Sequence, residues 1–100
     1  MNFFEKREYN RIKHMTEVVA NLINSYKATL YDLEHDHFPE NEVIRKECIR
    51  IILAGSGCKT IEEAKEYYEN QIARLEKEQH ELYLKMAKYS KWSPTVHIEN

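Results

Sequence analysis

The stretch that decides the fold is a short segment that holds both glycines of the chain. It reads Leu53-Ala54-Gly55-Ser56-Gly57-Cys58-Lys59-Thr60. Because the chain has only 2 glycines, this is the one place where its composition plainly favours a sharp backbone turn. The segment has two interpretations, a phosphate-binding loop and a turn between two helices, and they imply different functions.

The phosphate-binding interpretation fails on the positions of the glycines. A Walker-type loop requires Gly, four residues, and then Gly-Lys-Ser or Gly-Lys-Thr. Lys59 and Thr60 match the end of the motif, but Cys58 and Leu53 stand where its two glycines belong. No second strand candidate follows at the spacing of a βαβ unit. We therefore expect neither a nucleotide nor any other cofactor.

As a turn between helices, the same segment agrees with known capping chemistry. Gly55 or Gly57 can take the left-handed conformation that ends a helix. Thr60 is followed three positions later by Glu63, which is the pattern of a capping box at a helix N-terminus. The sequence predicts that one helix ends within the glycine pair and that another begins near residue 61.

Before the glycines, the pattern predicts a long helix over about 4–37 and a short one over 40–54. Apolar residues of the first segment recur at helical spacing and form one stripe. The stripe contains Phe4, Ile12, Met15, Val19, Leu22, Ile23, Tyr26, Leu30 and Leu33. Pro39 ends the first helix or lies in the first turn of the second. The short helix is apolar over most of its circumference, so we expect it to be packed between other helices.

After the glycines, a heptad pattern predicts a second long helix over about 61–91. Ile61, Tyr68, Leu75, Leu82 and Tyr89 recur every seven residues. Ile72, Gln79 and Met86 occupy the complementary seam positions. Gln79 has two interpretations: a buried polar residue that fixes the register of association, or a residue at a gap in the packing that reaches water. Residues 92–100 do not have a helical pattern.

These elements predict an all-α fold with one helical domain over 1–91. The two long helices form an antiparallel hairpin or small bundle, joined by the short helix. Since each broad apolar stripe would stay half exposed in a monomer, we expect a coiled-coil-like homodimer. The predicted interface consists of Tyr68, Ile72, Leu75, Gln79, Leu82, Met86, Tyr89 and Trp92.

Composition agrees with helices and argues against several functions. Charged residues make up 32% and hydrophobic residues 42%, while only 2 prolines and 2 glycines supply turns. A formal net charge of -2 gives no global basic field for nucleic acid. Charged residues come early, so we expect no export signal, and no stretch has the length of a membrane span. We expect a cytoplasmic protein with free thiols.

A local basic cluster supports an alternative function, which is nucleic-acid binding. The cluster consists of Lys6, Arg7, Arg11 and Lys13, interleaved with Phe3, Phe4 and Tyr9. Basic and aromatic side chains together can hold nucleic acid. Glu5 and Glu8 interrupt the cluster, so a solvated helix face is the preferred interpretation.

Candidates for metal binding and catalysis are weaker. Glu34 and His37 have the Glu-x-x-His spacing of carboxylate-bridged metal sites, but the chain has no second copy of the motif. Cys58 lies near Lys59 and a predicted helix N-terminus, which favours a reactive thiolate. No acid or histidine follows closely enough in sequence to complete a nucleophilic pair. We expect no metal and no catalytic residues.

The segment from Ile44 to Tyr89 resembles the distal part of MerR-family transcription regulators. The resemblance is carried by residues 51–55, by Thr60-Ile61-Glu62-Glu63-Ala64 and by the heptads up to Tyr89. It implies a short helix that ends at a glycine, followed by a long helix that pairs two subunits in an antiparallel coiled coil. The N-terminal half lacks the winged helix-turn-helix with which that family binds DNA.

The sequence therefore favours a small, non-enzymatic, protein-binding protein, which acts as a regulator, an inhibitor or an assembly factor. The partner is a protein of unknown identity. The alternative is a nucleic-acid-associated transcriptional regulator that uses the basic N-terminal helix face. Abundant Asn, Lys, Ile and Tyr are typical of AT-rich genomes, including those of phages.

Overall fold

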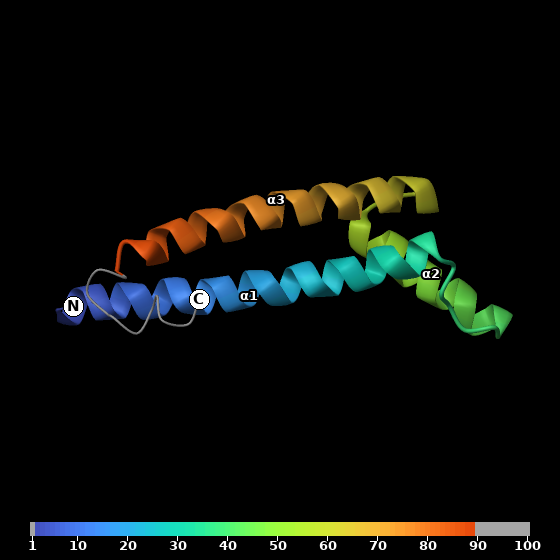
Figure 1. The fold of residues 1–100 in the computed structure, drawn as a ribbon. Coiled ribbons are helices and arrows are strands. Elements are labelled where there is room, and N and C mark those ends of the chain that lie inside the picture. The colour runs from blue at the N-terminus through green and yellow to red at the C-terminus, as the bar shows by residue number, and fades with distance from the viewer. Residues whose placement is uncertain (1, 90–100) are drawn as a thin grey trace. The chain divides into compact units, whose positions relative to one another are not determined.

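A computed structural model describes residues 2–89 of the chain, and within them all regular structure is helical. Three helices follow one another: α1 over Phe3–Glu34, α2 over Glu42–Ser56 and α3 over Ile61–Ala87 (Figure 1). The all-α class and the order of a long, a short and a long helix are confirmed. None of the helices in this part of the chain has the length and apolar character that a membrane crossing needs.

A reciprocal pair of hydrogen bonds caps the start of α1. The Glu5 backbone N–H donates to Asn2 Oδ1 over 2.8 Å, and the Asn2 N–H donates to Glu5 Oε1 over 3.1 Å. This is a capping box in which asparagine replaces the usual serine or threonine. The helix consequently begins at Phe3, within one residue of the predicted start.

The end of α1 comes earlier than the predicted residue 37 because the backbone turns left-handed at Asp36. Asp36 has φ 50°, a conformation that aspartate tolerates better than most residues. The His37 N–H then donates to the Asp32 carbonyl over 2.9 Å, which closes the turn. The helix therefore ends at Glu34.

Both ends of α2 have a well-defined cap. At the start, Asn41 Oδ1 accepts hydrogen bonds from the N–H groups of Val43 and Ile44, over 3.0 and 3.1 Å. At the end, Gly57 adopts the left-handed conformation with φ 70° and ψ 17°. Of the two glycines left open by the sequence, Gly57 is the cap, whereas Gly55 lies within the helix. Both ends of α2 therefore lie two residues further along the chain than the predicted 40–54.

Thr60 begins α3 as the sequence predicts, with one difference in the capping bonds. The Glu63 N–H donates to Thr60 Oγ1 over 3.2 Å, which is the expected half of a capping box. In the other half, the Glu63 carboxylate accepts from the Thr60 hydroxyl over 3.0 Å instead of from its backbone N–H. At the far end, the Tyr89 N–H donates to the Met86 carbonyl over 2.9 Å, a tightened turn after Ala87.

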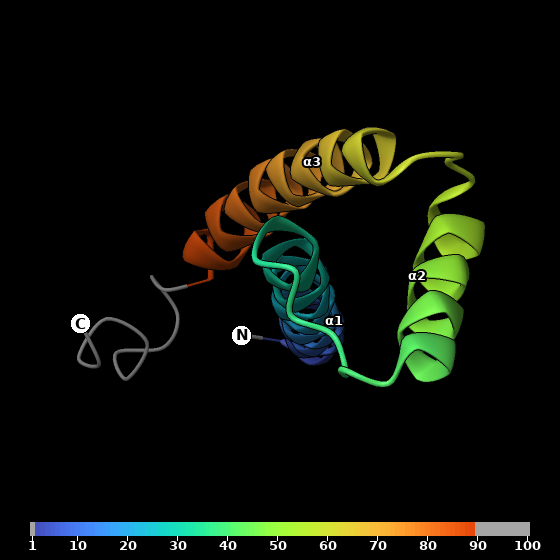
Figure 2. The ribbon, with the colours of Figure 1, turned by 90° about the vertical axis from the view of Figure 1, so that its right-hand side faces the viewer.

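The contacts of the chain gather in two units. Unit 2 spans Ile23–Arg74 and holds the end of α1, all of α2 and the start of α3. Its core consists of the buried side chains of Leu33, Ala64 and Tyr68. These side chains come from α1 and α3, and α2 packs against them through partly buried residues; Figure 2 views the three helices along α1. Its partly buried neighbours are Tyr26, Leu30, Phe38, Ile52, Leu53, Cys58, Ile61 and Tyr67.

Unit 1 combines Met1–Leu22 with Leu75–Asn100. Here the start of α1 lies beside the end of α3 (Figure 1). The rings of Tyr9 and Tyr89 meet edge to face at 5.8 Å between centroids, so the start of α1 contacts the residues that follow α3. The buried side chains of this unit are Ile12, Thr16, Val19, Leu75 and Leu82. Within unit 1, the start of α1 therefore packs against the end of α3, as the predicted pairing of the two long helices requires.

Candidate interaction surfaces

Most residues of the predicted interface on α3 are covered by other parts of the chain. In unit 2, Tyr68 and Ile72 are each 8% exposed; in unit 1, Leu75 and Leu82 are each 4% exposed. Three further members of the set are half-buried, namely Gln79, Met86 and Tyr89. Trp92 and the predicted non-helical tail lie outside the described residues. The role of this set at an interface stays a prediction.

Three tyrosines pack against one another in unit 2. The Tyr68 ring contacts that of Tyr26 at 5.5 Å between centroids and that of Tyr67 at 5.1 Å. These tilted and edge-to-face contacts are favourable aromatic geometries. Burial raises the pKa of the Tyr68 hydroxyl above its ordinary value, with smaller contributions from Tyr67, Tyr26 and Cys58. Tyr68 therefore belongs to the interior of the unit.

The largest departure from the predicted packing is on α2. The sequence predicts that this helix lies between others, yet none of its residues is buried. Ile52 and Leu53 pack on the core of unit 2, whereas Val43, Ile44 and Ile51 are 78%, 51% and 57% exposed. Because the core touches only one side of the helix, the apolar residues on the other side stay in solvent.

These exposed residues share one side of α2 with the half-buried Cys48, and we call this set the α2 stripe. It consists of Val43, Ile44, Cys48 and Ile51. At roughly 100° per residue, the four side chains fall within less than half of the helix circumference. Cys48 is half-buried and its thiol is free. Scattered exposed apolar residues are common in proteins, but a contiguous row of them typically marks an interaction site.

One ion pair lies along an edge of the α2 stripe, and two other ion pairs lie further round the helix. Arg50 pairs with Glu47, and Lys46 pairs with Glu42, all four side chains being largely exposed. The pairing with Arg50 lowers the pKa of Glu47. On the inner side, Arg45 pairs with Asp36 and lies 5.7 Å from the centroid of the Phe38 ring. The stripe therefore has one pair of opposite charges, Glu47 and Arg50, along its edge.

The predicted basic cluster on α1 is divided between two faces of the helix. Arg7 and Arg11 share one face, and Lys6 and Lys13 share another, about 130° away at 100° per residue. All four side chains are exposed. The division reduces the density of positive charge that either face offers to a phosphate backbone.

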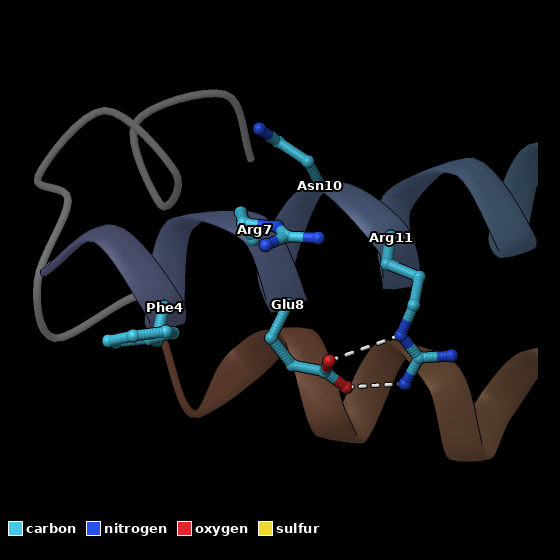
Figure 3. Close-up of a pocket in the computed structure, with 5 residues that line it drawn as sticks. All are labelled: Phe4, Arg7, Glu8, Asn10 and Arg11. Carbon is cyan, nitrogen blue, oxygen red and sulfur yellow. Dashed lines mark hydrogen bonds and ion pairs between the residues drawn. The ribbon is translucent and has the colours of Figure 1, made fainter.

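The arginine face is further occupied by partners from the same helix. Figure 3 shows the Arg11 guanidinium facing the Glu8 carboxylate, with Nε 3.1 Å from Oε2 and a second bond from Nη2 to Oε1. This bidentate bond lowers the pKa of Glu8. Arg7 lies 5.8 Å from the centroid of the Phe3 ring. Arg7, Glu8 and Arg11 line a cavity of about 670 Å³ together with Phe4 and Asn10. The Glu8 carboxylate offsets the charge of Arg11 along this cavity.

The histidines at the end of α1, where the sequence has its Glu-x-x-His spacing, have partners from the same region. His37 Nδ1 lies 2.9 Å from Asp32 Oδ1. His35 Nδ1 lies 3.0 Å from the Tyr31 carbonyl oxygen. The imidazole ring of His35 also stacks on the Tyr31 ring, with 4.1 Å between the ring centroids. Within residues 2–89, no three His, Cys, Asp or Glu side chains converge in a way that could hold a metal ion.

Cys58 lies in the turn between α2 and α3, at a small open cavity of about 280 Å³. Its neighbours along the cavity are Glu63, Glu66, Tyr67 and Asn70. The thiol lies 3.6 Å from the Ser56 carbonyl, to which it can donate a hydrogen bond. Two carboxylate side chains, Glu63 and Glu66, therefore lie along the same cavity as the thiol.

The sequence matches no protein-family model, no curated protein and no solved structure. The similarity of residues 44–89 to MerR-family regulators therefore rests on the pattern of helices and caps alone.

Proposed function

We propose that the chain is a non-enzymatic protein-binding protein of the cytoplasm that acts as a homodimer through its helical surfaces. A regulator, an inhibitor or an assembly factor, including one encoded by a phage, fits this description. The observation that carries the proposal is the α2 stripe, in which three large aliphatic side chains are each more than half exposed.

The energetics of these side chains support a partner. Full burial of an aliphatic side chain of this size contributes about 1.5–3 kcal/mol. With more than half of each surface still exposed, a partner that covered Val43, Ile44 and Ile51 would gain roughly 1 kcal/mol from each, before the cost of association. The four residues of the α2 stripe stand at positions i, i+1, i+5 and i+8. This arrangement resembles the apolar face of helices that dock into grooves.

A site-specific photo-cross-linker tests the proposal directly. We would place the photoreactive amino acid benzoylphenylalanine at position 44, in the stripe, or at position 84 on α3. Leu84 is 55% exposed, close to the 51% of Ile44, so it is a matched control. We expect cross-linked protein adducts at position 44, formed with a second copy or another protein in the native cell. Equal adduct formation at both positions would contradict the proposal.

A further inference from the structure

We propose that the α2 stripe is the interface of the homodimer, with two copies of α2 packed antiparallel around a two-fold axis close to Cys48. This inference rests on the proposed homodimer and names its surface. For such an interface, the spacing, the shape and the charges of the stripe must be complementary to those of the same stripe on a second copy.

The spacing of the stripe suits a helix–helix seam. Ile44, Cys48 and Ile51 are separated by four and then three residues, which is the repeat of coiled-coil core positions. Gly55 continues the series four residues further on, and it is exposed. A glycine at this point allows the two backbones to approach closely. Four consecutive seam positions are thus free of charged side chains.

The charges along the edge of the stripe select the antiparallel orientation. Glu47 and Arg50 lie on the same side of α2 and bond to each other, with 55% and 66% of their side chains exposed. In an antiparallel pair whose two-fold axis passes between residues 48 and 49, Glu47 of each copy lies opposite Arg50 of the other copy. In a parallel pair, by contrast, the charged edges of the two helices lie on opposite sides of the seam, so Glu47 of one copy does not meet Arg50 of the other.

This axis also interleaves the seam residues. Cys48 lies nearest to the axis, so it is close to Cys48 of the second copy. Ile44 of one copy lies between the levels of Ile51 and Gly55 of the other, so that a large side chain faces a gap beside a small residue. Alternation of large and small residues across facing positions is how tightly packed helix pairs are built.

The size of the stripe indicates a weak dimer. A standard stable interface covers about 800 Å² on each partner, more than four side chains on one helix can supply. We therefore expect a reversible dimer, visible over a range from micromolar to millimolar concentration. The full-length chain should be studied by sedimentation equilibrium across this range.

Substitutions in the stripe test the surface. The double variant I44S/I51S should raise the dimer dissociation constant at least tenfold, whereas L84S on α3 should leave it unchanged. E47R alone or R50E alone should weaken self-association, and an equimolar mixture of the two should associate more strongly than either. Circular dichroism would verify that every variant keeps its helices, since all these positions are exposed.

Cysteine cross-linking tests the orientation. With C58S, the remaining Cys48 should give a covalent dimer with a short bismaleimide. With I44C/C48A/C58S, the thiols of an antiparallel pair are about nine residues apart along the axis, or ~13 Å at 1.5 Å per residue. That variant should cross-link poorly. Equal cross-linking of both variants would indicate a parallel pair and overturn the inference.

The outcomes separate this inference from the proposed function. A wild-type dimer that is unaffected by I44S/I51S and gives no Cys48 cross-link would leave the homodimer standing and overturn the α2 interface. A monomer at every concentration would overturn both the homodimer and the inference. In that case, adducts at position 44 with another protein would still support the protein-binding function.

Discussion

The backbone N–H of Cys58 donates a hydrogen bond to the carbonyl of Leu53 over 3.1 Å, which joins the first residue after the α2 cap to the last turn of the helix. Together with the bond from the Gly57 N–H to the Ala54 carbonyl, at 3.3 Å, it forms a Schellman motif. Leu53 and Cys58 both pack on the core of unit 2. The turn between α2 and α3 is therefore set by one left-handed residue and held by hydrogen bonds and apolar packing.

The two glycines should respond in opposite ways to alanine. Gly57 has φ 70°, where a side chain is strained, so Gly57→Ala should lower the free energy of unfolding by about 1–2 kcal/mol. At Gly55, an added Cβ would meet nothing nearer than the Tyr68 hydroxyl at 4.0 Å. Gly55→Ala should therefore be neutral or stabilise the helix by up to about 1 kcal/mol. Urea denaturation followed by circular dichroism measures both changes, and equal effects would contradict the assigned cap.

Asn41 should stabilise the start of α2 through its side chain. Because Asn41 Oδ1 accepts from two backbone N–H groups, Asn41→Ala should reduce stability by about 1 kcal/mol. Asn41→Asp keeps an acceptor oxygen at the same place and should retain the stability. Thermal unfolding of the two variants provides the measurement. An equal loss of stability in both would mean that Asn41 does not stabilise the helix as a hydrogen-bond acceptor.

Leu33 is the aliphatic side chain at the centre of unit 2, with 4% exposure. Leu33→Ala should reduce the free energy of unfolding by about 2–5 kcal/mol, because it removes buried surface and leaves a cavity. The matched exposed substitution is Val43→Ala, at a residue with 78% exposure, and it should change the stability by less than about 0.5 kcal/mol. Chemical denaturation should show this contrast, and similar losses would place the core elsewhere.

The sequence predicts the helices well because their signals are local. Periodic apolar residues define α1 and α3, and Thr60 with Glu63 marks the start of α3 at Ile61. The end of α1 is harder to predict, because a left-handed aspartate is not distinguishable from an ordinary one by pattern. The same holds for Asn41, which caps α2 without the glutamate or glutamine three residues later that completes a capping box.

The candidate surface could not be predicted in this way, since exposure depends on which side of a helix meets the core. A helix that is apolar over most of its circumference is expected to be covered on all sides. In unit 2, however, the core contacts Ile52 and Leu53 and leaves Ile44 and Ile51 in solvent. Conversely, Tyr68 and Leu82 belong to regular seams that fit equally well between subunits or within one chain. Periodicity alone does not distinguish these two cases.

The raised pKa of Tyr68 predicts a specific loss of stability at alkaline pH. In the folded chain, burial disfavours the phenolate, so the folded-state pKa lies above the ordinary phenol value of about 10. The contribution of Tyr68 to stability is therefore complete below that pH and is lost as the pH rises through the folded-state pKa. Tyr68→Phe keeps the packing against Tyr26 and Tyr67 but has no proton to lose. Urea denaturation between pH 8 and pH 11 should show a steeper fall for the wild type than for Tyr68→Phe, whereas parallel curves would mean that this hydroxyl ionises without a stability penalty.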